Sequence, residues 1–426
     1  METLWNTRRP VIRSAVLRWI WEVYTERFTR AGRWFFWPTG AFLNFTATSP
    51  TLEAYVATCY AFGLWAVALA ALVLFRPRVS IRTVLPERAC AGEVVPFDVE
   101  VEQEGRLGGI DLRVALHRPP AAVESEPEEG AAVPYLARGE KARVRLAIRC
   151  TRRGAHRLQG LRVETAFPLG LLCAARAFPD ERPLLIYPRF HRLGRMDLPS
   201  GRRHQPGGVA LASALGDAAE FVGNRDWRDG DSVRDIDWRA TARLDRLVVR
   251  EFREEYFVRV ALILDTHVPP PQGLFGRSQP RRDDFERAVS LCAAVGDWLA
   301  RQEYLVDIFA AGPSLYHLTA GRSLAYLDQV LDILAVVDES PEEPFDRIEP
   351  ELSENLAKIS AVVAVFLDWN EPRRRFIQKL RAQGVAVKVV IACDGKTALP
   401  PEADADALGP VPVVTRAAFE AGVEEL

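Results

Sequence analysis

Arginine, aspartate and tryptophan side chains are concentrated in one short part of the chain, residues 221–250. Its arginines include Arg225, Arg228, Arg234, Arg239 and Arg243, and its aspartates include Asp226, Asp229, Asp231, Asp235 and Asp237. Guanidinium and carboxylate groups at this spacing can form bidentate ion pairs, and indole rings can pack beside them. Because the charges nearly cancel, we predict a network of Arg–Asp pairs with Trp227 and Trp238 as packing anchors.

Such a network could orient two domains, form a docking surface or form an active site. Most Arg–Asp clusters are structural, which favours the first alternative for the bare pattern. The tripeptide Asp229-Gly230-Asp231 is a turn signal. We expect Asp231 and Arg234, which flank this turn, to belong to a structural latch. We expect Arg225 and Arg228, which precede it, to face a partner.

The sequence lacks the usual catalytic motifs. There is no Ser or Cys nucleophile beside a His, no HExxH zinc motif and no phosphate-binding loop. The hypothesis is therefore a protein that binds other proteins, not an enzyme, and that needs no cofactor. The alternatives are an enzyme of unknown reaction that uses residues 225–243 as its site, and a membrane protein that assembles with itself.

Composition narrows the class of protein. The chain has 426 residues, 48% of them hydrophobic, which is ample for two or three cores. Its 55 basic and 57 acidic residues give a net charge of −2, whereas a dedicated nucleic-acid binder needs a basic surplus. Six cysteines are widely spaced, without a CxxC pair, which suits a reducing cytoplasm and argues against a thiolate zinc site.

The N-terminal region is expected to anchor the protein in a lipid bilayer. Residues 54–75 carry no charge and would span about 33 Å as a helix, enough for a bilayer core. A weaker uncharged stretch, residues 34–52, would complete a transmembrane hairpin over 34–76; the alternative for it is an interfacial or re-entrant segment. Arginines flank the hairpin on both sides and are missing from its link, so both termini and the soluble domains should be cytoplasmic. Residues 1–33 form an amphipathic segment that lies on the inner leaflet or packs against the protein.

Three soluble parts should follow the hairpin. Short alternating runs between turn residues predict a β-sandwich over 78–190. Residues 191–254 read as a linker that contains the Arg–Asp–Trp segment. Over 255–426, apolar strands alternate with amphipathic helices, which predicts an α/β domain with a parallel, doubly wound sheet. Two of its strands end in Asp265 and Asp368, at the edge where such sheets bind ligands.

The Arg–Asp–Trp segment resembles the signature of the domain of unknown function 58 family, roughly R-x-Y-x-x-G-D-x-x-R-x-I-x-W-x-x-S/T-A-R. The matching residues are Arg225, Gly230, Asp231, Arg234, Ile236, Trp238, Thr241, Ala242 and Arg243. Trp227 stands where the family usually has Tyr, and Asp229 where it often has Pro. Three further segments resemble short motifs of the family: Thr151-Arg152-Arg153-Gly154-Ala155-His156, Phe167-Pro168-Leu169-Gly170-Leu171, which lacks the family's Asp, and Ile186-Tyr187-Pro188.

The resemblance implies a bacterial inner-membrane protein with a von Willebrand factor A-like α/β domain. It implies an adaptor or co-chaperone role with a MoxR-type AAA+ ATPase as partner, and in some cases a transglutaminase-like membrane protein. The expected partner-binding or structural signature residues are Arg225, Trp227, Arg228, Gly230, Asp231, Arg234, Asp237, Trp238, Arg239, Thr241 and Arg243.

The sequence departs from that family fold at its metal site. A von Willebrand factor A domain holds Mg²⁺ through D-x-S-x-S after the first strand, because hydroxyl and carboxylate oxygens suit a hard cation. Here Asp265 is kept, but His267 and Pro269 occupy the two Ser positions. Asp265 and Asp368 are therefore weak candidates, and we expect no metal.

Overall fold

The computed structural model describes residues 24, 27–48, 51–199, 219–228, 231–254, 259–270, 279–311, 315–320 and 324–426. Most of the expected amphipathic segment over 1–33, residues 49 and 50 of the hairpin link, and the turn residues Asp229 and Gly230 lie outside the described residues. The chain divides into two compact units, Met1–Tyr187 and Pro188–Leu426, and each is treated by itself below.

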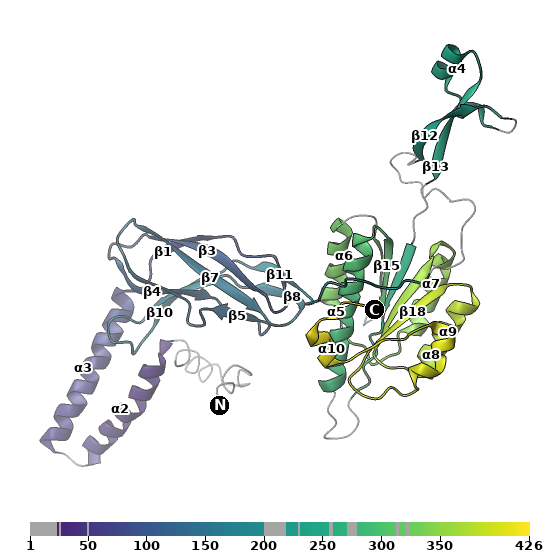
Figure 1. Ribbon diagram of the computed structural model, residues 1–426. Helices are drawn as coiled ribbons and strands as arrows, with labels where there is room; N and C mark the ends of the chain where they lie inside the picture. Colours follow the sequence, from purple (N-terminus) through teal and green to yellow (C-terminus); the bar gives the residue numbers. More distant parts are fainter. Residues whose placement is uncertain are drawn as a thin grey trace. The chain divides into compact units, whose positions relative to one another are not determined.

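Two long helices begin the first unit and lie side by side (Figure 1). Helix α3 (Leu52–Leu74) has 23 residues and is long and apolar enough to cross a membrane, the only such helix among the described residues. Helix α2 (Arg30–Thr48) contains Pro38 and falls short of that test. The two helices are joined by buried hydroxyl groups, with Thr46 Oγ1 2.7 Å from Thr58 Oγ1. Two packed helices are thus present, and α3 is the long apolar one.

The rest of the first unit consists of strands. They are β1 (Val79–Thr83), β2 (Arg88–Cys90), β3 (Val94–Gln103), β4 (Gly109–Leu116), β5 (Val123–Glu126), β6 (Ala131–Leu136), β7 (Lys141–Cys150), β8 (Gly154–Leu158), β9 (Leu161–Thr165), β10 (Ala174–Phe178) and β11 (Arg182–Tyr187). They form sheets in the orders β1-β3-β7-β5, β10-β9-β4-β6 and β2-β11-β8. Side chains such as Val99, Val114 and Ile148 are fully buried in one shared core. The region is β-sandwich-like, because alternate residues of strands such as β3, β7 and β9 face that core.

The second unit contains a six-stranded sheet in the order β16-β15-β14-β17-β18-β19. Its strands are β14 (Arg259–Leu264), β15 (Leu305–Ala311), β16 (Leu315–Ala320), β17 (Ala361–Phe366), β18 (Ala386–Ala392) and β19 (Val413–Val414). The prediction of a wholly parallel sheet is wrong, because β16 pairs with β15 in the antiparallel sense. Too few residues separate these two strands for a parallel crossover, which needs a dozen or more.

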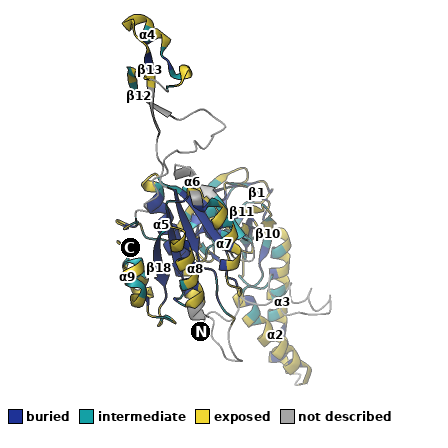
Figure 2. Ribbon diagram, turned by 90° about the vertical axis from the view of Figure 1, so that its right-hand side faces the viewer, coloured by how far each residue is buried: buried dark blue, intermediate teal, exposed yellow. Residues whose placement is uncertain are grey.

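Helices cover this mixed sheet. They are α5 (Gln279–Arg301), α6 (Leu324–Val336), α7 (Phe345–Asn355), α8 (Glu371–Ala382), α9 (Ala405–Leu408) and α10 (Arg416–Ala421), with the 3₁₀ turns η2 (Leu356–Lys358) and η3 (Pro401–Asp404). Strands β14 and β17 are buried along their whole length. The ribbons of this sheet near the β18 label are dark blue in Figure 2. On one face, Ile348 of α7 and Phe376 of α8 share a core with Ile263 and Phe366 of the sheet.

The Arg–Asp–Trp segment folds into a hairpin of its own, although the sequence suggested only a linker. Strand β12 (Ala219–Asp226) pairs antiparallel with β13 (Val248–Glu254), and Asp226 lies opposite Val248. Between the strands come the 3₁₀ turn η1 (Val233–Asp235) and the short helix α4 (Trp238–Leu244). We refer to residues 219–254 as the signature hairpin.

Candidate functional site

One bidentate ion pair organises the signature hairpin. Arg225, near the end of β12, donates from Nη1 to Asp231 Oδ2 and from Nη2 to Asp231 Oδ1, each over 2.7 Å. The backbone N–H of Arg228 also donates to Asp231 Oδ2, over 2.8 Å. The hydrogen bond from the Arg225 side chain, followed by that from the Arg228 backbone, lowers the pKa of Asp231 to about 2. Asp231 therefore stays ionised, and its hydrogen bonds to Arg225 and Arg228 hold the segment that follows β12.

A second aspartate begins helix α4. Asp237 Oδ1 accepts the backbone N–H groups of Arg239, over 3.1 Å, and Ala240, over 2.9 Å, which is the usual role of an N-cap carboxylate. The Ala240 hydrogen bond is the largest cause that lowers the pKa of Asp237. In the middle of α4, Thr241 Oγ1 accepts the N–H of Val248, over 3.1 Å. Helix α4 is thus tied to strand β13.

These contacts leave a row of side chains exposed. Trp238 is 62% exposed and Val233 is 66% exposed. Arg234, Arg239 and Arg243 are exposed as well, and no ion pair holds their guanidinium groups in the described part of the chain. Helix α4 is mostly yellow in Figure 2 for this reason. We call the exposed set the hairpin face; it consists of Val233, Arg234, Trp238, Arg239 and Arg243.

The structure reverses two assignments made from the sequence. Arg225, expected to face a partner, is the ion-pair partner of Asp231. Arg234, expected in the latch, is exposed, because it lies in η1, whose neighbouring Val233 also faces solvent. Trp238 is no packing anchor, since more than half of its surface is exposed. Trp227 is half-buried, as an anchor would be, and its backbone N–H donates to Leu247 O over 3.0 Å.

The predicted signature residues therefore separate into two groups. One group makes contacts inside the hairpin: Arg225, Arg228 (through its backbone N–H), Asp231, Asp237 and Thr241. The other group is exposed: Arg234, Trp238, Arg239 and Arg243. Gly230 lies outside the described residues. Sequence reasoning missed Asn224, whose amide donates to Asp237 Oδ2 over 3.3 Å, and Ser232, whose hydroxyl caps η1. A Ser at this place is a typical cap signal and could have been noticed.

The other candidate lies at the carboxyl edge of the α/β sheet. Asp265 is fully buried, and one of its oxygens accepts Arg373 Nε over 2.7 Å and the N–H of Leu367 over 3.0 Å. Arg373 Nη2 is 2.6 Å from the same oxygen. The other oxygen accepts the N–H of His267 over 3.0 Å. A guanidinium thus already neutralises this carboxylate, and the residues present do not fit a Mg²⁺ ion.

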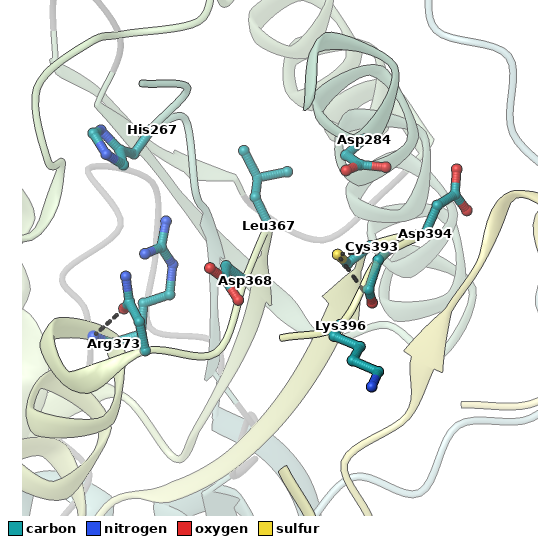
Figure 3. A pocket seen from close by; sticks show the side chains of 10 residues that line it. His267, Asp284, Leu367, Asp368, Arg373, Cys393, Asp394 and Lys396 are labelled. Atoms are coloured by element: carbon teal, nitrogen blue, oxygen red, sulfur yellow. Dashed lines mark hydrogen bonds between the residues drawn. The ribbon is translucent and has the colours of Figure 1, made fainter. Parts of the chain in front are cut away.

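Asp368 is engaged in backbone contacts at the same edge. Its Oδ1 accepts the N–H groups of Trp369, over 2.7 Å, and Ala398, over 2.9 Å. It lines a cavity of about 270 Å³ together with His267, Asp284, Leu367, Asn370, Arg373, Cys393, Asp394, Gly395 and Lys396 (Figure 3). Within the described residues, no three His, Cys, Asp or Glu side chains are grouped so as to hold a metal.

Two groups in this cavity are shifted towards their neutral forms. Burial raises the pKa of the Asp284 carboxyl, and the nearby Arg287 guanidinium partly opposes that shift. Burial also raises the pKa of the Cys393 thiol, so this sulfur is protonated and a poor nucleophile at neutral pH. Among the described residues that line the cavity, none is an activated nucleophile and no group of side chains is arranged to hold a cation.

Comparison with known proteins bears on the signature hairpin. The DUF58 family, described as a protein of unknown function, matches residues 223–315. Uncharacterized protein YeaD of Bacillus subtilis is 27% identical over 183 residues, which cover 41% of this chain and 42% of YeaD. The match thus spans less than half of that relative.

Solved structures resemble the chain only weakly. Native α2-macroglobulin of Escherichia coli is 17% identical over 26% of this chain and 7% of its own, with a TM-score of 0.20. The CARDB domain of a Pyrococcus furiosus protein is 12% identical over 26% of this chain and 88% of its own, with a TM-score of 0.17. Neither likeness carries an argument about function. The family match confirms the resemblance seen in the signature: residues 223–315 form a DUF58 family domain, and the chain is a distant homologue of YeaD.

Proposed function

We propose that this protein is a membrane-anchored adaptor that binds a protein partner through the hairpin face. The observation that carries the proposal is the exposure of Trp238, 62%, beside three arginines that make no ion pair among the described residues. Tryptophan and arginine are the side chains most enriched at binding hot spots. A partner with an apolar pocket for the indole and carboxylates for the guanidinium groups fits this face.

The internal contacts of the hairpin support a binding role over a catalytic one. Asp231 and Asp237 accept hydrogen bonds inside the hairpin, and both pKa values are lowered. Carboxyl groups with low pKa values are weak general bases and cannot act as acids near neutral pH. The network thus suits a rigid support for exposed side chains, and the rival enzyme at 225–243 has no comparable support.

The resemblance to the family suggests the partner. We propose a MoxR-type AAA+ ATPase, with a transglutaminase-like membrane protein as a further component. The α/β region would be a degenerate von Willebrand factor A-like domain, in which Arg373 holds Asp265 instead of a metal ion. No cofactor is required for this role.

The proposed location is the bacterial inner membrane, with both termini and the soluble domains in the cytoplasm. Helix α3 supports the anchor, since its 23 residues would span about 34 Å. Arg76, Arg78 and Arg82 follow it directly, as the positive-inside rule requires of a cytoplasmic end. Helix α2 would be the second, shorter membrane segment.

The experiment measures binding of a purified MoxR-type ATPase from the same genome to the full chain in nanodiscs. Trp238→Ala should weaken binding by about 30-fold or more, the size of a hot-spot loss. Tyr135→Ala is the matched control, because Tyr135 of β6 is 61% exposed but belongs to the first unit. Equal affinities for the two variants would end the proposal for this face.

A further inference from the structure

A loop of the β-sandwich-like region contacts the start of the helical hairpin. Residues 167–172 connect β9 to β10, and the Thr29 hydroxyl, just before α2, donates to the carbonyl of Gly170 and, over 3.2 Å, to that of Leu171. The backbone N–H of Thr29 also donates to Leu171 O over 3.2 Å. On the far side of the loop, Cys173 N–H donates to Arg27 O over 2.7 Å. Backbone contacts therefore fix the loop against the N-terminal end of α2.

Glycine makes this close approach possible. A Cβ atom on Gly32 of α2 would lie 1.9 Å from Leu171 O, which no other residue could accept without a shift. Gly170 has a φ of +67°, a backbone conformation that suits glycine. The loop also reaches the other helix, because the Phe167 ring lies perpendicular to that of Phe75, which follows α3, with 5.0 Å between centroids. The loop thus contacts both helices at the end of the hairpin that carries the arginines.

The exposed part of this loop has the composition of a membrane-surface contact. Pro168 and Leu169 are exposed, and Phe167 of the same loop packs against Phe75 at the end of α3. Exposed arginines lie at both helix ends nearby, Arg30 at the start of α2 and Arg76 just after α3. Apolar side chains beside basic ones bind at the boundary between acyl chains and anionic headgroups.

We propose that the loop Phe167–Leu172, together with Arg30 and Arg76, contacts the anionic phospholipid surface. Leu169 enters the headgroup layer, and the two guanidinium groups bind lipid phosphates. The contact would hold the β-sandwich-like region at the bilayer and limit its rotation on the anchor. This inference rests on the proposed membrane anchor, but it does not depend on the partner of the hairpin face.

The test places an NBD fluorophore at Leu169→Cys in the full chain, with Cys59 and Cys90 replaced by Ala. The protein is reconstituted in nanodiscs that contain phosphatidylglycerol and headgroup-nitroxide lipids. Val94→Cys is the matched control, since Val94 is 38% and Leu169 37% exposed. Val94 begins β3, about 30 Å from the Gln103 end that adjoins Arg78. We expect quenching at Leu169 to exceed that at Val94 several-fold; equal quenching would overturn the inference.

Two further measurements show which part of the inference is wrong if quenching at Leu169 is not observed. A probe at Val67→Cys of α3, which is 51% exposed, reports insertion through quenching by acyl-chain nitroxides. If Val67 is quenched and Leu169 is not, the anchor stands and only the loop contact is wrong. If neither is quenched, the anchor itself is wrong. In the Arg30→Gln/Arg76→Gln variant, quenching at Leu169 should fall to the level seen in neutral phosphatidylcholine; unchanged quenching would remove the arginines from the proposal.

Discussion

Among the arginine–aspartate pairs of the second unit, Arg373–Asp265 and Arg225–Asp231 have similar chemistry and different surroundings. The Arg373 and Asp265 side chains are 2% and 0% exposed, whereas those of Arg225 and Asp231 are 31% and 17% exposed. The first pair ties helix α8 to the end of strand β14 inside the core. The second pair fixes a surface segment beside exposed arginines that form no ion pair with any residue the structure describes. Burial thus decides whether such a pair supports the fold or positions a surface.

The largest effect on stability is expected at the buried pair, Arg373 and Asp265. Arg373→Met should destabilise the α/β region by about 3–5 kcal/mol, because it leaves the buried Asp265 carboxylate without its guanidinium counter-charge. Differential scanning fluorimetry of the full chain in detergent should show a large fall in the melting temperature of that region. Arg375→Met is the control, since Arg375 lies on the same helix and is 71% exposed. Similar shifts for both variants would contradict the distinction between the two pairs.

An intermediate effect is expected from acid at the surface pair. The pKa of Asp231 is lowered to about 2 in the folded hairpin, against 3.8 for the free side chain. Its contribution to hairpin stability is therefore fully present above about pH 4 and is lost as the pH falls towards 2. Carboxyl NMR of ¹³C-labelled aspartate should show this low pKa, and Arg225→Gln should return it towards 3.8. An unchanged titration in Arg225→Gln would mean that Arg225 is not the cause.

A small effect on stability is expected at the hairpin face. Arg234→Ala and Arg239→Ala remove exposed side chains that make no ion pair with any described residue. Surface substitutions of this kind change the free energy of unfolding by less than about 0.5 kcal/mol. The melting temperature of each variant should match the wild type within error. A clear fall for Arg234→Ala would restore the latch that the sequence suggested.

The smallest effect is the response to Mg²⁺. Asp265 is already paired with Arg373, and His267 and Pro269 replace the two expected Ser ligands. Titration of MgCl₂ into the full chain should produce no specific heat and no change in melting temperature. A micromolar site that Asp265→Ala abolishes would contradict this reading of the sheet edge.

Local patterns in the sequence predicted many of the helices and strands but not how they pair. Alternation over residues 94–102 gave strand β3, and an uncharged run over 54–75 gave helix α3. The antiparallel strand β16 was missed because its hydrophobic pattern is weak, although its short link to β15 implies a hairpin. Local sequence patterns could not identify the partner of Asp265, because Arg373 lies 108 residues away.

The candidate site shows the same limit over a shorter distance. The composition of residues 221–250 pointed to ion pairs, and Asp231 was rightly placed among them. Which arginine pairs with it depends on the path of the chain after β12, which brings Asp231 back to Arg225 and turns Arg234 to solvent. The spacing of residues along the sequence does not determine that path. The sequence alone could therefore not show which of Arg225 and Arg234 pairs with Asp231.

One side-by-side measurement tests the central claim that the hairpin face binds and the buried pair stabilises. Arg234→Ala and Arg373→Met, each in the full chain in nanodiscs, are compared for melting temperature and for affinity towards the MoxR-type ATPase, below the melting temperature of both. Arg234→Ala should keep the wild-type melting temperature and lose affinity for the ATPase. Arg373→Met should have a lower melting temperature and keep its affinity. Wild-type affinity in Arg234→Ala, together with lost affinity in Arg373→Met, would contradict the central claim and move the binding surface to the α/β region.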